Sequence, residues 1–339
     1  MTPYLPPRCI PVLATAVVAV ALYAAGAVQY PGFASLRVLV NLFGDNAVLG
    51  IAAVGATFVI LSGGIDLSTG AMVALASTLI ARLLAPADLP GSTALGGYLH
   101  DAHPAVAIGA ALALGGGLGA AQGALIHCYR LPPFLVTLAG MFFCRGLAFC
   151  VHPQSLSITH PFYLRTVAVD LALPLPGGLT LPPPAVCFVA VLAAGIVLAH
   201  WTRFGRCVYA VGDAAASAAL MGLPVGRTRI LVYTLAGGAS ALAGVVHTCY
   251  TQAGDPTAAI GFELDAIAAV VIGGTLLSGG VGFVGGTALG VLIHGLIQTL
   301  ITFHGALNSW WTRIAIGLLL LVFIGLQNLV VAVARRRPG

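Results

Sequence analysis

Residues 61–70 read LSGGIDLSTG, and this stretch separates two apolar runs, AVLGIAAVGATFVI at 47–60 and AMVALASTLIA at 71–81. Paired glycines free the backbone for conformations outside a helix, and Asp66 and Ser68 supply capping groups for a new helix. The stretch therefore predicts a helix break between two apolar segments. Because lipid cannot satisfy the backbone groups that a break exposes, this one must face protein or a water-filled cavity.

The chain as a whole is too apolar for water. Of its 339 residues, 59% are hydrophobic and 7% are charged, whereas soluble domains carry about 25% charged residues. We therefore expect an all-α, polytopic membrane protein that forms a single domain over residues 1–339, with about ten transmembrane helices, some of them broken. Ten apolar segments approach the roughly 20 residues of a spanning helix, the first read as an uncleaved span; they lie near 9–28, 44–62, 67–86, 104–128, 134–152, 183–201, 229–250, 263–277, 283–303 and 309–332.

All 14 basic residues are arginines. If the N- and C-termini are both cytoplasmic, nine of the arginines lie at inner ends of the spans, including the tail 335–337, which would sit near anionic lipid. The positive-inside rule favours this orientation. Residues 202–228 then form a cytoplasmic loop, and residues 153–182 form a periplasmic loop. The absence of lysine excludes a standard P-loop, whose lysine contacts the nucleotide phosphates, so this chain is not expected to bind ATP.

Other chemistry has little basis in the sequence. The seven cysteines and nine histidines are scattered, without the spacing of a zinc site. No catalytic triad or pair of catalytic carboxylates emerges. We expect no metal, no cofactor bound by this chain, no enzymatic activity and no nucleic-acid partner.

The tetrapeptide LSGG occurs twice, at 61–64 and at 277–280, after the second and eighth predicted spans. An internal repeat is one interpretation, since many transporters are built from repeats. Candidates for the wall of a translocation pathway are the glycines of both copies, the two polar residues after the first copy and one arginine within a span: Gly63, Gly64, Asp66, Ser68, Arg145, Gly279 and Gly280.

Two of these candidates leave alternatives open. Asp66 either lines the pathway, as an ionisable residue at a break in a membrane protein often does, or only caps the following helix. Arg145, in GMFFCRGLAF, is costly within a span unless it is paired or hydrated. It either contacts a polar solute or pairs with a carboxylate such as Asp66 or Asp265.

Glycines four residues apart occur in two spans and place small residues on one helix face. They are Gly115, Gly119 and Gly123 in one span and Gly282, Gly286 and Gly290 in another. We expect close helix packing there rather than a substrate site.

The loop at 202–228 contains DAAASAALMG at 213–222. A capping residue, a helix-forming run and a terminal glycine predict one short helix. This helix either lies on lipid headgroups or docks into a partner as a helix in a groove.

Three long motifs resemble one family of membrane proteins. VGATFVILSGGIDLSTGAMVAL at 54–75, VGDAAASAALMGL at 211–223 and ELDAIAAVVIGGTLLSGGVGFVGGTALG at 263–290 are similar to the permeases of ATP-binding-cassette importers for monosaccharides of the ribose, xylose and galactose class. The likeness runs from about Pro31 to Gln327. Within the class, YPGFASLRV, TLAGMFFCRGLAF, YTQAG and SWWTRIAIG resemble a galactofuranose importer permease.

The resemblance implies a set of partners in the bacterial inner membrane. These are a second permease in a heterodimer, a cytoplasmic ATPase that uses ATP and magnesium, and a periplasmic sugar-binding protein. The loop helix would be the coupling helix that contacts the ATPase, through Gly212, Asp213, Ala215, Ser217, Gly222 and Leu223. Asp213 stands where the family usually has Asn, which keeps the capping ability and adds a negative charge.

Two other classes of protein are alternatives. A stand-alone carrier or channel for a small polar solute would take up solute without ATP. However, an ion-driven carrier usually places several carboxylates in the membrane interior, and here Asp66 is nearly alone. A membrane-embedded enzyme would show turnover without a binding protein.

Overall fold

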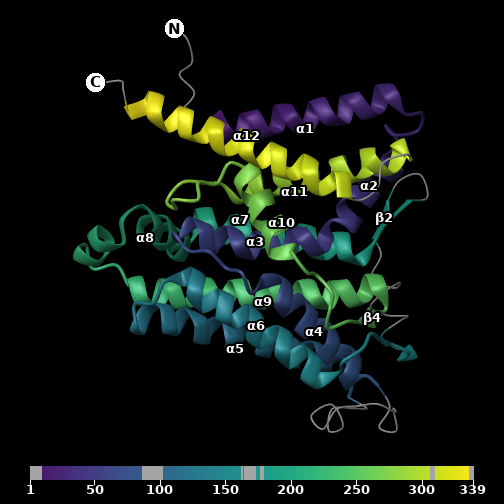
Figure 1. The fold of residues 1–339 in the computed structure, drawn as a ribbon, viewed down its shortest axis with the longest axis horizontal. Helices are drawn as coiled ribbons and strands as arrows, with labels where there is room; N and C mark the ends of the chain where they lie inside the picture. The colour runs from purple at the N-terminus through teal and green to yellow at the C-terminus, as the bar shows by residue number, and fades with distance from the viewer. Residues whose placement is uncertain are drawn as a thin grey trace.

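The computed structural model describes residues 10–85, 102–161, 163, 173–175, 179–305 and 310–335, and these form a helical bundle (Figure 1). Its helices are α1 (Ile10–Gln29), α2 (Leu36–Asp45), α3 (Ala47–Leu61), α4 (Thr69–Leu83), α5 (Pro104–Cys128), α6 (Pro133–Val151), α7 (Pro183–Trp201), α8 (Arg203–Leu220), α9 (Val225–Thr251), α10 (Phe262–Ile272), α11 (Val284–His304) and α12 (Trp310–Arg335). Two short antiparallel ladders join β1 (Leu156–Ser157) to β4 (Ala253–Gly254) and β2 (Leu173–Leu175) to β3 (Leu179–Leu181). The predicted all-α class is confirmed.

Each of the ten predicted spans contains one helix. Within the described residues, six helices are long and apolar enough to cross a membrane alone, and α2 with α3 makes a seventh span bent by 55°. Three of the four helices beside the two LSGG copies are shorter, with 15 residues in α3, 15 in α4 and 11 in α10, whereas α11 has 21. These three are short because the glycine-rich loops end them early.

The sequence did not predict α2. The bend between α2 and α3 falls at Asn46, whose side-chain amide donates to the carbonyl of Leu42 at 2.9 Å. This bond satisfies one carbonyl at the end of α2 and helps the chain to turn into α3. The predicted span at 44–62 is therefore the second part of a bent pair.

The helices share a common orientation across the bundle. In Figure 1, one side of the molecule holds α8, the start of α1 and the end of α12. The opposite side holds α2, β2 and β4. We call these the α8 side and the β4 side. The start of α1, the end of α12 and the 202–228 loop therefore share one side, as the charge pattern predicted. That this side is cytoplasmic stays a prediction.

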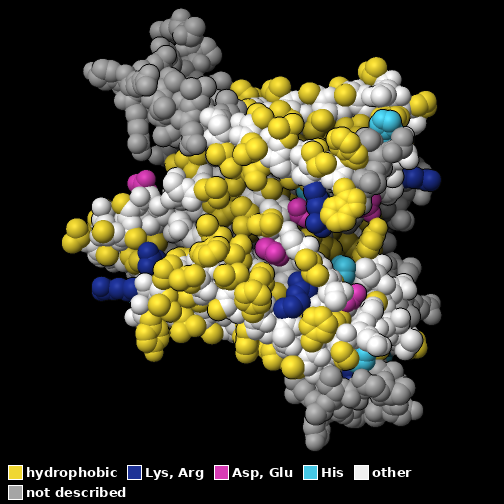
Figure 2. Space-filling model, in the orientation of Figure 1, with side chains coloured by type: hydrophobic (Ala, Val, Ile, Leu, Met, Phe, Trp, Pro, Cys, Tyr) yellow, Lys and Arg dark blue, Asp and Glu magenta, His cyan; other side chains and the backbone are white. Residues whose placement is uncertain are grey.

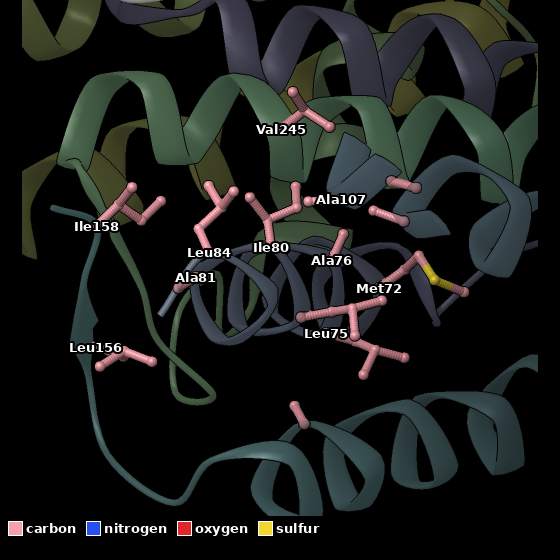
Figure 3. Close-up of a cluster of buried hydrophobic side chains, with 14 of the residues drawn as sticks. Met72, Leu75, Ala76, Ile80, Ala81, Leu84, Ala107, Leu156, Ile158 and Val245 are labelled. Carbon is pink, nitrogen blue, oxygen red and sulfur yellow. The ribbon is translucent and has the colours of Figure 1, made fainter. Parts of the chain in front are cut away.

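The core is built around α4 and α9. Nearly every residue of α4 is buried, and α9 contacts α3, α4 and α5. Figure 3 shows Met72, Leu75 and Ile80 of α4 packed with Val245 of α9 and Ile158 beyond β1. Burial on all faces explains why α4 reads as apolar throughout rather than as an amphipathic helix.

The spaced glycines of α5 form a packing seam against α9. A Cβ atom added at Gly123 would lie 2.8 Å from the Cα of Ile230, and one added at Gly115 would lie 2.6 Å from the carbonyl oxygen of Gly237. Gly119 contacts the Tyr233 carbonyl in the same way. The predicted packing role is confirmed for this seam.

The helix in the 202–228 loop is longer than predicted. It was expected at 213–222, but α8 begins at Arg203, with Thr202 as its N-cap residue. Ala214 breaks the helical conformation with φ −156° and ψ 90°, so α8 has a first part at 203–213 and a second part at 215–220. Much of the predicted periplasmic loop, at 162, 164–172 and 176–178, lies outside the described residues.

Candidate functional site

The first LSGG copy ends α3. Gly63 has φ +79°, a left-handed conformation that favours glycine, and Gly64 donates its amide to the carbonyl of Val59 at 2.9 Å. This hydrogen bond closes the last turn of α3, and the left-handed conformation of Gly63 turns the chain away from the helix axis. The predicted interruption at this stretch is confirmed.

Asp66 is bonded within its own loop. One carboxylate oxygen accepts hydrogen bonds from the backbone amide and the hydroxyl of Ser68, both at 2.7 Å, and the other accepts from the hydroxyl of Thr69 at 3.4 Å. The side chain is 3% exposed. Gln122 of α5 bonds the Ser68 hydroxyl at 3.2 Å, which ties this loop to the neighbouring helix. Asp66 thus has the contacts of a capping group, and a pathway role for it stays a prediction.

The second LSGG copy forms a tight turn between α10 and α11. Gly279 and Gly280 have φ +85° and +72°. The amide of Leu276 bonds the carbonyl of Val281 at 2.9 Å, and the amide of Gly279 bonds the carbonyl of Leu276 at 3.0 Å. The chain therefore reverses within a few residues before α11 begins.

The two LSGG copies touch each other and α8. The amide of Gly280 donates to the carbonyl of Leu61 at 2.9 Å. At Gly212 of α8, an added Cβ would collide with the same carbonyl and would lie 2.7 Å from the amide nitrogen of Gly280. One added at Gly279 would lie 2.8 Å from the amide nitrogen of Gly63. We call this contact of the 61–63, 212–213 and 279–280 backbones the glycine junction.

A tyrosine reinforces the glycine junction. Tyr209, in the first part of α8, donates its hydroxyl proton to the carbonyl of Gly282 at 2.9 Å. Burial raises the pKa of Tyr209 to about 12, so the hydroxyl retains the proton that it donates. Next to it, the rings of His200 and Phe283 lie 4.7 Å apart between centroids.

The second part of α8 points away from the bundle. Its end is closed by two hydrogen bonds, from the amide of Gly222 to Ala219 and from the amide of Leu223 to Ala218, both at 3.0 Å. With φ +77° at Gly222, this is a Schellman-type end. Leu220 and Met221 at the tip are 91% and 70% exposed. Figure 1 shows this tip projecting beyond the other helices, and in the same orientation in Figure 2 hydrophobic side chains cover its end.

The predicted site residues therefore fall into two groups. The structure brings Gly63, Gly64, Gly212, Gly279 and Gly280 together, with Asp213 in contact with Gly280. Ala215 lines a cavity beside the junction together with Gly63 and Gly64. Ser217, Gly222 and Leu223 lie toward the exposed tip of α8.

Arg145 stands apart from the junction. Its guanidinium donates to the carbonyls of Pro256 and Ala258, at 2.6 and 2.7 Å, in the loop between β4 and α10. These backbone bonds replace the carboxylate pairing that the sequence left open. Arg145 thus fixes the loop on the β4 side to α6.

Sequence reasoning missed Tyr209 and Tyr233 as site residues. Tyr233 of α9 lies against Gly64 and is 2% exposed, and its hydroxyl has no hydrogen-bond partner among the described residues. Tyrosines in apolar helices carry no signal that separates them from ordinary core residues. Within the same part of the chain, no cluster of three His, Cys, Asp or Glu residues could hold a metal ion.

Comparison with known proteins supplies the family. Residues 38–324 match the family described as "Branched-chain amino acid transport system / permease component". The inner membrane ABC transporter permease protein YjfF of Escherichia coli is 49% identical over 95% of this chain and 92% of its own length. The fructose import permease protein FruG of Bifidobacterium longum is 35% identical over 96% of this chain and 93% of its own length.

A further relative is the ribose import permease protein RbsC of Escherichia coli, which is 34% identical over 88% of each chain. No solved structure matches the chain. The match to the family covers most of the sequence and both LSGG copies. The chain therefore belongs to this family of ABC transporter permease components and is a multi-pass protein of the inner membrane.

Proposed function

We propose that the chain is the translocation subunit of an ATP-driven importer that carries a monosaccharide, galactofuranose, into the cytoplasm. It would act as a heterodimer with a second permease, receive the sugar from a periplasmic binding protein, and be driven by a cytoplasmic ATPase. The names of the relatives support a sugar as the cargo, since two of them are import permeases for fructose and ribose.

The glycine junction is the observation that carries this proposal. A coupling helix must transmit motion from an ATPase to the membrane helices. Here the first part of α8 contacts the end of α3 and the loop between α10 and α11 through backbone atoms, without flexible side chains between them. Because close-packed backbones transmit displacement with little compliance, a movement of α8 would shift both LSGG loops together.

The second part of α8 is suited to contact the ATPase. Its exposed apolar tip, Leu220 and Met221, offers the anchors of a helix in a groove, and Asp213 and Ser217 are exposed beside it. The break at Ala214 separates this docking part from the part held at the junction. We propose that Gly212, Asp213, Ala215, Ser217, Gly222 and Leu223 form the coupling segment.

A cavity on the β4 side supports an uncharged, hydroxyl-rich cargo. It has a volume of about 450 Å³, lies between α2, the end of α9 and α11, and is lined by neutral amides, one acid and aromatic rings. Its polar and aromatic lining residues include Asn41, Asp45, Asn46, Gln298, Tyr250 and Phe303. Such side chains bond hydroxyl groups and stack on apolar ring faces.

Reconstitution tests the proposal. The chain is co-expressed with candidate partner subunits encoded beside it, purified, and placed in vesicles with labelled furanose or pyranose sugars. We expect an ATPase and a second permease to co-purify, and uptake to require ATP and the binding protein, with galactofuranose preferred. Uptake by vesicles that contain this chain alone, driven by an ion gradient and indifferent to ATP, would overturn the proposal.

A further inference from the structure

Two cavities meet at the α8 ends of α5 and α6. The first, of about 570 Å³, is a groove between these helices within the apolar part of the bundle. The second, of about 710 Å³, lies where α5 ends and where α6 and α9 begin. Leu131 and Pro132 line both cavities, so the two cavities are adjacent.

The groove is apolar and open to the surface of the bundle. Leu125 and Leu131 are 43% and 42% exposed, and Leu135 and Phe143 are each 56% exposed. All four line the groove, which has one polar lining side chain, Gln122. Helices α5 and α6 are both long and apolar enough to span a membrane, so this groove lies at the depth of the lipid tails.

The second cavity is cationic. It is lined by His127, Arg130 and Arg229, and no acidic residue is among its lining side chains. Within the described part of the chain, neither arginine forms a hydrogen bond or an ion pair. The buried Tyr233, whose hydroxyl lacks a partner, also lines this cavity. The cavity thus presents cationic side chains at the depth of the lipid headgroups.

We propose that the two cavities together form a binding site for one anionic phospholipid. An acyl chain would lie in the groove, and the phosphate would accept hydrogen bonds from Arg130 and Arg229. A soluble anion would leave the groove empty, and a zwitterionic lipid would bring a cationic ammonium group beside the two arginines as well as a phosphate. An anionic lipid matches both halves of the site.

The site adjoins the first LSGG copy and the proposed coupling segment of α8. Ser62, Gly63 and Gly64 of the first LSGG copy and Ala215 and Ala219 of α8 line the same cationic cavity. The headgroup would therefore bridge α8 to the start of α6. Bound lipid would fix the position of the coupling segment relative to the glycine junction.

Native mass spectrometry of the purified full chain tests the proposal. Phosphatidylglycerol and phosphatidylcholine with identical acyl chains serve as probes. We expect one phosphatidylglycerol to be retained per chain, and each neutralised arginine to weaken its binding about fivefold. The double variant Arg130→Gln/Arg229→Gln is compared with Arg206→Gln/Arg227→Gln, which removes two exposed arginines that do not line the cavity.

A second variant keeps the charges and fills the groove. Ala121→Trp places a bulky ring in the groove and should abolish retention of long-chain phosphatidylglycerol while leaving the arginines in place. Equal binding of both lipids, equal loss in the control variant, or unchanged binding in Ala121→Trp would overturn the proposal. Binding of inorganic phosphate as tight as that of the lipid would assign the cavity to a soluble anion instead. Loss of ATPase co-purification in the double variant, with lipid binding intact, would assign it to the partner subunit.

Discussion

The α5–α9 seam and the glycine junction both depend on glycine, but they use it differently. In the seam, glycines in regular helices let two long helices approach along their length. In the junction, three glycines with positive φ bring non-helical turns from distant parts of the chain against α8. The seam holds two long spans together, α5 and α9, whereas the junction joins the LSGG loops to a helix with an exposed tip. We infer that the seam serves stability and the junction serves transmission.

The largest effect is expected in the seam. Gly119→Leu would drive a side chain into the backbone of α9 at Tyr233, and overpacking against backbone costs about 3 kcal/mol or more. We expect little folded protein, measured by thermal unfolding in detergent. Gly117→Leu is the matched control, because nothing lies within 4 Å of a Cβ at Gly117, and it should change stability by about 0.5 kcal/mol at most.

We expect a substitution in the glycine junction to reduce transport more than it reduces the stability of the fold. Gly212→Ala places a methyl group against the Leu61 carbonyl and the Gly280 amide, which should displace α8 from the LSGG loops. We expect ATP-driven uptake to fall by about tenfold or more, equivalent to about 1.4 kcal/mol or more, while the protein remains folded. Gly238→Ala in α9, with open space around its Cβ, is the control. If Gly212→Ala lost stability and uptake in parallel, the distinction between the two regions would fail.

A third test concerns the loop behind the junction. Asp66→Ala removes the acceptor of the Ser68 amide and hydroxyl and leaves buried donors unpaired, at a cost of about 1–3 kcal/mol. Asp66→Asn keeps one carbonyl oxygen and should recover much of the loss. A thermal unfolding series of both variants measures this. An Asp66→Asn protein with normal stability and no uptake would instead place Asp66 in the pathway.

The smallest effect is expected at the hydrogen bond between α8 and the loop before α11. Tyr209→Phe removes the bond to the Gly282 carbonyl, a loss of about 0.5–1.5 kcal/mol. We expect a modest decrease in stability and a severalfold decrease in uptake. Tyr129→Phe, at a position that is 72% exposed, should leave both measurements unchanged. An uptake rate equal to wild type in Tyr209→Phe would show that the backbone contacts of the junction suffice.

The sequence predicted most of the fold, because a membrane solvent leaves few alternatives. Ten apolar segments, the break at LSGGIDLSTG and the seam of α5 all follow from hydropathy and glycine spacing. Helix α2 was missed because Asn46 interrupts one apolar run with a bend rather than a loop. The first part of α8 was missed because RFGRCVYAVG at 203–212 contains two glycines and two arginines, which are typical of a loop.

The candidate site was predicted as separate pieces. Both LSGG copies and Gly212 were named, but their contact depends on how α3, α8 and α10 meet in space, and no local pattern encodes that. Arg145 was expected to need a charged or polar partner. Its partners are backbone carbonyls of the loop between β4 and α10, and no pattern in the sequence indicated that this loop lies beside α6. Tyr233 has no pattern that distinguishes it within the apolar helix α9, and Tyr209 lies in a segment that the sequence did not predict to be helical.

The hydrogen bond between Gly280 and Leu61 also determines how late in translation the end of α3 can gain its last hydrogen-bond partner. The Leu61 carbonyl is made early, and its partner amide leaves the ribosome only when most of the chain has been translated. At about 5–20 residues per second, the interval is on the order of 10 to 40 s. During that time the Leu61 carbonyl at the end of α3 lacks this partner. We therefore expect the N-terminal half of the nascent chain to stay in the hydrated surroundings of the insertion machinery until the loop after α10 has been made.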